Sequence, residues 1–151
     1  MKKQLATVII GFIAGLAISG VLGDLIVAVN NSAGRISSAW SISKAEKYVA
    51  GGNFEAASAE YEKALKKINP DNKKLLAKTE NNLAMCVFSI ADKKNDALGI
   101  KRSIGIFSES LALSKETGDS QSISQVETNI NEAEAVLSHL KAEHKDFARR
   151  V

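Results

Sequence analysis

Cysteine, proline, histidine and aromatic residues are all scarce in this chain of 151 residues. It holds one cysteine, one proline and two histidines, and aromatic residues make up 5% of it. Because Cys86 is alone, an intrachain disulfide is excluded, and its apolar neighbours indicate a small core residue. His139 and His144 are five positions apart and so do not share a helix face, which argues against a metal site.

The sequence also lacks the patterns that carry catalytic or nucleic-acid chemistry. No glycine-rich phosphate loop follows a strand pattern, and the acidic residues show no metal-binding or glycosidase spacing. The 20 basic residues are interspersed with 17 acidic ones, so the net charge of +3 forms no continuous basic face. We therefore expect neither an enzyme nor a nucleic-acid-binding protein, and we expect no cofactor and no metal.

Charge is absent from a long apolar stretch near the N-terminus. Residues 5–23 contain no charged residue, and Lys2 and Lys3 precede them. A helix needs about 20 apolar residues to cross a bilayer, whereas the core of a cleaved signal peptide is usually shorter. We interpret residues 1–29 as a retained transmembrane signal anchor. The alternative is that this segment is removed, which would leave a soluble exported protein.

The charge bias around this anchor predicts its orientation. The positive charges of Lys2, Lys3 and the α-amino group lie together on one side, while Arg35 and Lys44 are spread over the other. Because positive charge is retained on the cytoplasmic side, we expect a cytoplasmic N-terminus. The rest of the chain would then lie outside a bacterial-type cytoplasmic membrane, crossed once.

Small residues recur at every fourth position of the anchor. Residues four apart lie above one another on a helix, so these form one smooth ridge. In membranes such a ridge lets two helices approach closely, and packing then drives their association. We expect it to contact other membrane-protein subunits or a second copy of this chain. The packing ridge consists of Gly11, Gly15, Ser19 and Gly23.

The remainder of the chain has the composition of an all-α domain, rich in alanine, lysine, glutamate, leucine and serine. Residues 30–34 read as a hinge. Residues 35–118 are expected to form two helical hairpins, and residues 119–151 a long amphipathic C-terminal helix. In the first hairpin, Gly51 and Gly52 should end one helix and Asn53 should cap the next.

The first hairpin resembles a tetratricopeptide repeat, a helix-turn-helix unit of 34 residues. The resemblance covers residues 38–71 and rests on the spacing of small and aromatic residues. A second hairpin matches more loosely and is extended at its turn, around Lys93 to Asp96. Its second helix contains Gly99 and Gly105, which we interpret as points of close packing. The repeat-defining core is Ala45, Tyr48, Gly52, Phe54, Ala57, Tyr61, Ala64 and Leu65.

This resemblance implies a scaffold or adaptor that binds a protein or peptide partner. In that family, ligands lie on the concave surface formed by the first helix of each hairpin. An accessory subunit or an assembly factor of a membrane protein complex would fit such a role. The corresponding positions in this chain are Ile42, Glu46, Val49, Lys78, Asn81, Met85 and Phe88.

The C-terminal helix leaves a second function open. Its apolar positions are alternately three and four apart, which suits either a helix that caps the last hairpin or a coiled-coil seam for another chain. With the packing ridge, a seam would make the chain a structural subunit of a homo-oligomer or filament. We favour a C-terminal helix that caps the last hairpin and an adaptor function.

Overall fold

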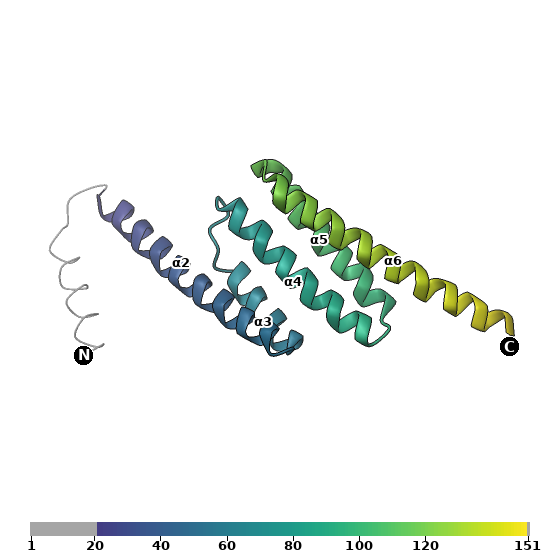
Figure 1. Ribbon diagram of the computed structural model, residues 1–151. Helices are drawn as coiled ribbons and strands as arrows, with labels where there is room; N and C mark the ends of the chain where they lie inside the picture. Colours follow the sequence, from purple (N-terminus) through teal and green to yellow (C-terminus); the bar gives the residue numbers. More distant parts are fainter. Residues whose placement is uncertain (1–20, 151) are drawn as a thin grey trace. The chain divides into compact units, whose positions relative to one another are not determined.

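The computed structural model describes the backbone of residues 21–150 and the side chains of residues 32–143. Every regular element in this range is a helix, which confirms the expected all-α class. As Figure 1 shows, the helices follow one another as α2 (Val21–Ala50), α3 (Phe54–Leu65), α4 (Lys73–Lys93), α5 (Ala97–Thr117) and α6 (Ser120–Arg150).

The chain divides into two compact units, residues 1–34 and 35–151. The boundary follows the expected hinge, and the backbone is helical through residues 30–34, so the helix does not end there and a hinge at these residues stays a prediction. Glycine costs a helix interior only about 1 kcal/mol and asparagine less, which the flanking helix formers outweigh. Among the described residues, no helix is both long and apolar enough to cross a membrane. The expected anchor lies mostly outside this range, as do Gly11, Gly15 and Ser19.

Three of the turns between helices share one local design. A residue with positive φ ends the first helix, and an asparagine or aspartate directly after it caps the next. Gly52 (φ 73°) precedes Asn53, whose side chain accepts a hydrogen bond of 3.0 Å from the Ala56 amide. Glycine adopts this backbone conformation without strain. The predicted helix end and cap are therefore confirmed, and the same pairing occurs at Asn95–Asp96 and Gly118–Asp119.

Consecutive helices of the second unit pack side by side, α3 on α4, α4 on α5 and α5 on α6. Their apolar residues form two clusters. The first joins α4, α5 and α6 around Phe107 and Ile100, and α6 closes it with Val126, Ala133 and Leu140. The second joins α2, α3 and α4; its buried members are Ala45, Ala57, Tyr61, Leu83, Cys86 and Val87.

Small residues bring α4 and α5 close together. Ala77, Ala84 and Ala91, seven apart on α4, are all buried. On α5, Ser110 Oγ donates a hydrogen bond of 2.7 Å to the Ala77 carbonyl. Gly99 is a point of close packing, as expected. For Gly105 this prediction is wrong, because no atom of the described residues lies within 4 Å of the position that its Cβ would take.

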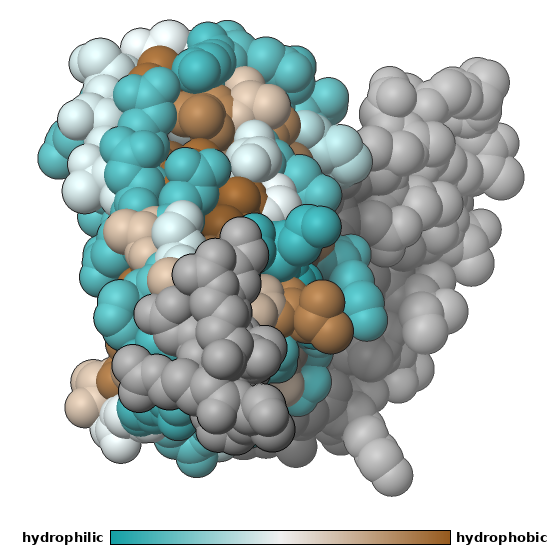
Figure 2. All heavy atoms as spheres, turned by 90° about the vertical axis from the view of Figure 1, so that its right-hand side faces the viewer, coloured by the Kyte–Doolittle hydropathy of each residue, from teal (hydrophilic) through white to brown (hydrophobic). Residues whose placement is uncertain are grey.

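Polar side chains cover the outside of the helices. Figure 2 views the molecule from the right-hand side of Figure 1, and the coloured surface there is mostly hydrophilic. Apolar residues appear between the polar ones in separate areas. The apolar faces of α3, α4, α5 and α6 are thus used for packing within the unit.

Candidate protein-binding groove

A groove of about 490 Å³ opens between helices that are far apart in the sequence. α2, α4 and α6 contribute most of its walls, and α3 contributes two aromatic side chains. These are the first helices of the two hairpins together with the closing helix. Its lining residues are Glu46, Val49, Phe54, Tyr61, Asn81, Asn82, Met85, Cys86, Ser89, Gln125 and Asn129.

A second, more polar cavity of about 330 Å³ lies farther along α4 and α6. It shares Asn81, Asn82 and Gln125 with the groove, so the two are neighbours on the same face of the unit. Lys78 is the charged residue in its lining. The buried hydroxyl of Ser114 also lines it and has no hydrogen-bond partner among the described residues.

Carboxamide side chains connect the two sites. Asn129 of α6 donates a hydrogen bond of 2.9 Å from Nδ2 to Oδ1 of Asn81 on α4. Each amide has two donors and an acceptor with two lone pairs, so one such bond leaves capacity for others. A row of carboxamides therefore presents the donors and acceptors that a peptide backbone needs, without adding net charge.

Besides the carboxamides, Glu46 and Ser89, the lining of the groove is apolar or aromatic. Met85 is 36% exposed and Val49 is 37% exposed, which places both at the surface of the groove. Below them, burial raises the pKa of Tyr61 to about 12 and that of the Cys86 thiol to about 11. Both groups are therefore protonated at neutral pH. A protonated, buried thiol is a poor nucleophile.

The structure brings most of the predicted binding residues together. Glu46, Val49, Asn81 and Met85 line the groove, and Asn81 lines the cavity too, with Lys78. Two others lie elsewhere. Phe88 is buried in the first cluster and Ile42 packs against the second, so neither lines the groove. Both side chains are apolar, and they point from their helices into the core instead of into the groove.

The sequence interpretation missed the contribution of other elements to the groove. Only the positions of first helices were assigned to binding, and α6 was treated as a cap. Residues of α6 line the groove because α6 packs against α4 as well as against α5. The amide-rich run after Gly118 was the available signal. The lining residues that were missed are Phe54, Tyr61, Asn82, Cys86, Ser89, Gln125 and Asn129.

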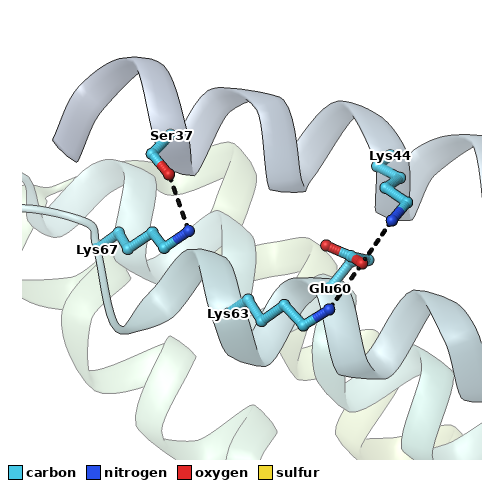
Figure 3. Close-up of polar contacts among 5 residues, drawn as sticks. All are labelled: Ser37, Lys44, Glu60, Lys63 and Lys67. Atoms are coloured by element: carbon cyan, nitrogen blue, oxygen red, sulfur yellow. Dashed lines mark hydrogen bonds and ion pairs between the residues drawn. The ribbon is translucent and has the colours of Figure 1, made fainter. Parts of the chain in front are cut away.

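A buried carboxylate fixes α2 against α3 and thereby one wall of the groove. The Glu60 side chain is 7% exposed, and its Oε1 lies 2.9 Å from both Lys44 Nζ and Lys63 Nζ (Figure 3). These two bonds hold the pKa of Glu60 below its usual value, with Lys63 the larger influence. Nearby, Lys67 Nζ donates a hydrogen bond of 2.8 Å to Ser37 Oγ.

This chain matches no protein-family model, no curated protein and no solved structure. The resemblance to tetratricopeptide repeats therefore stays a prediction from the residues named above. Within residues 32–143, no three His, Cys, Asp or Glu side chains gather in a way that could hold a metal ion.

Proposed function

We propose that this protein is a membrane-anchored, tetratricopeptide-like adaptor that holds a partner protein in the groove between α2, α4 and α6. The observation that carries the proposal is the groove itself, to which four helices contribute and whose lining is mainly amide and apolar side chains. On this proposal, the two hairpins form the repeat part and α6 caps them. The partner is a protein segment, and the chain serves as an accessory subunit or assembly factor.

The lining of the groove supports an extended peptide as ligand. Asn81, Asn82 and Asn129 offer hydrogen bonds to a backbone, while Val49 and Met85 offer apolar contacts to its side chains. Binding sites of this kind combine apolar surface with a few fixed polar groups. Methionine suits such a surface because its flexible side chain adapts to different neighbours.

The anchor part of the proposal rests on the sequence. Residues 5–23 are uncharged and follow Lys2 and Lys3, which favours a single span with a cytoplasmic N-terminus. On this proposal the packing ridge contacts other subunits in the bilayer. Mass spectrometry of the mature protein tests retention of the anchor: we expect the N-terminal segment to be present. A mature chain that starts near Gly20 would remove the anchor from the proposal.

A matched pair of variants tests the groove. Met85→Glu places a charge in the groove, and Leu98→Glu places one at the first turn of α5, where Leu98 is 80% exposed and lines neither site. The full chain is purified from membranes in mild detergent, and its bound proteins are quantified. We expect Met85→Glu to lose a partner that Leu98→Glu and the unaltered chain retain, by about tenfold or more.

Circular dichroism must first show that both variants keep their helix content. Equal recovery of every bound protein with the two variants would contradict binding in the groove. Equal loss from both would do so too, because it would show that any added charge on the surface suffices.

A further inference from the structure

The groove and the polar cavity each contain a single charged residue in their lining, and the two charges have opposite signs. Glu46 of α2 lines the groove but not the cavity, whereas Lys78 of α4 lines the cavity but not the groove. Both side chains are exposed, and neither forms an ion pair with another described residue. Each charge therefore has no counter-ion within the described part of the chain and is available to a ligand.

The groove and the cavity are continuous along α4, because they share Asn81, Asn82 and Gln125. On α4 their common lining runs from Ala77 in the cavity to Ser89 in the groove. At a rise of about 1.5 Å per residue, this stretch of helix is about 18 Å long. An extended peptide covers that length with about five residues. One extended segment can therefore occupy both sites at once.

The chemistry of the cavity favours an anionic group. Beside Lys78, its described lining offers carboxamides and hydroxyls as hydrogen-bond donors and contains no carboxylate. The Ser114 hydroxyl is buried and has no described hydrogen-bond partner, whereas that of Ser110 donates to the Ala77 carbonyl. An unpaired buried hydroxyl costs stability, and an acceptor oxygen in the cavity would remove this cost. A carboxylate supplies such an oxygen together with a charge opposite to that of Lys78.

We propose that the segment held in the groove carries an acidic side chain that enters the cavity toward Lys78, and a basic side chain, farther along, that pairs with Glu46. This inference rests on the proposed function and deepens it, because it assigns the charge order of the partner. Complementary charges contribute mainly to specificity, and like charges brought together are costly. The apolar contacts in the groove then supply most of the affinity, while the two charges fix the direction in which the segment runs.

Selection from a library of short random peptides tests the charge order, with the full chain immobilised in mild detergent. Peptides that bind the unaltered chain should share one acidic and one basic residue in a fixed order. For one selected peptide, Lys78→Glu should weaken binding at least about tenfold, because two carboxylates then face each other. Replacing the acidic residue of the peptide by lysine should restore binding to this variant. Lys101→Glu is the matched control, because Lys101 is exposed on α5 and lines neither site.

Exchange of both charges provides a second measurement. With Glu46→Lys and Lys78→Glu in one chain, whose helix content circular dichroism verifies, the selected peptides should carry their acidic and basic residues in the reverse order. If Met85→Glu abolishes binding but Lys78→Glu and Lys101→Glu bind equally well, the charge order is overturned and the groove is retained. If no peptide binds, or if Met85→Glu leaves binding unchanged, the proposed function is overturned together with this inference.

Discussion

A Cβ atom placed on Gly99 of α5 would lie 2.7 Å from the Cβ of Ala91 on α4 and equally close to Asp96 Oδ2. Carbon atoms do not approach so closely, so Gly99→Ala must move α5 or the cap of the helix. We expect Gly99→Ala to lower the free energy of unfolding by about 1–3 kcal/mol, as overpacking does. Urea denaturation followed by circular dichroism measures it.

Gly105 on the same helix provides the opposite case. It is exposed, and no described atom lies within 4 Å of the position that a Cβ would take there. Alanine is a better helix former there, so Gly105→Ala should raise the free energy of unfolding by about 0.5–1 kcal/mol. The same denaturation experiment applies. Destabilisation by both substitutions would show that the packing of α5 differs from that described here.

Ser110 and Ser114 are both buried, but only the hydroxyl of Ser110 has a hydrogen-bond partner among the described residues. Comparing their alanine variants therefore separates the stability contributed by a buried hydrogen bond from the cost of burying an unpaired hydroxyl. Ser110 Oγ bonds the Ala77 carbonyl, while Ser114 Oγ has no partner among the described residues. We expect Ser110→Ala to cost about 1–2 kcal/mol of stability. Ser114→Ala should be neutral or stabilising, because it removes a hydroxyl whose burial is uncompensated. Midpoints of thermal unfolding compare the two, and equal losses would contradict the assignment.

Glu80 should make stability depend on pH. Burial, and to a lesser degree the charge of Glu109, raise its pKa to about 7, and its Oε2 has no hydrogen-bond partner within the described part of the chain. The folded state therefore favours the protonated form, so its contribution is complete below about pH 4.5 and falls as the pH rises through 7. Glu80→Gln should remove this decline, and Glu109→Gln should shift it to lower pH. Unfolding curves from pH 4 to 8 report both.

Glu60 should show the opposite pH dependence. Lys63 and Lys44 lower its pKa, so the folded state favours the carboxylate. Its stabilising contribution is present above the ordinary glutamate pKa, near 4.5, and is lost as the pH falls below it. Glu60→Gln should therefore destabilise the protein at pH 7 but hardly at pH 3. If the difference between variant and unaltered chain were the same at both pH values, the two ion pairs would not be responsible.

Local signals in the sequence determined the helices and their ends. Gly52, Asn53 and Gly118 act through backbone conformation and short-range hydrogen bonds, which depend on neighbouring residues alone, so their roles could be predicted. The helix continues through residues 30–34, where the sequence predicts a hinge, because the turn-forming residues there are weak signals that helix formers on both sides override.

The tertiary structure alone decided which polar and small residues meet. Gly99 and Gly105 are equivalent in the sequence, but only Gly99 lies where α5 packs closely against α4. A Cβ there would clash with Ala91, whereas a Cβ at Gly105 would have no described atom within 4 Å. Likewise, the pairing of Asn81 with Asn129 depends on α6 packing against α4. Periodicity fixes the face of a helix that is apolar, but the partner of each position follows from how the helices pack in space.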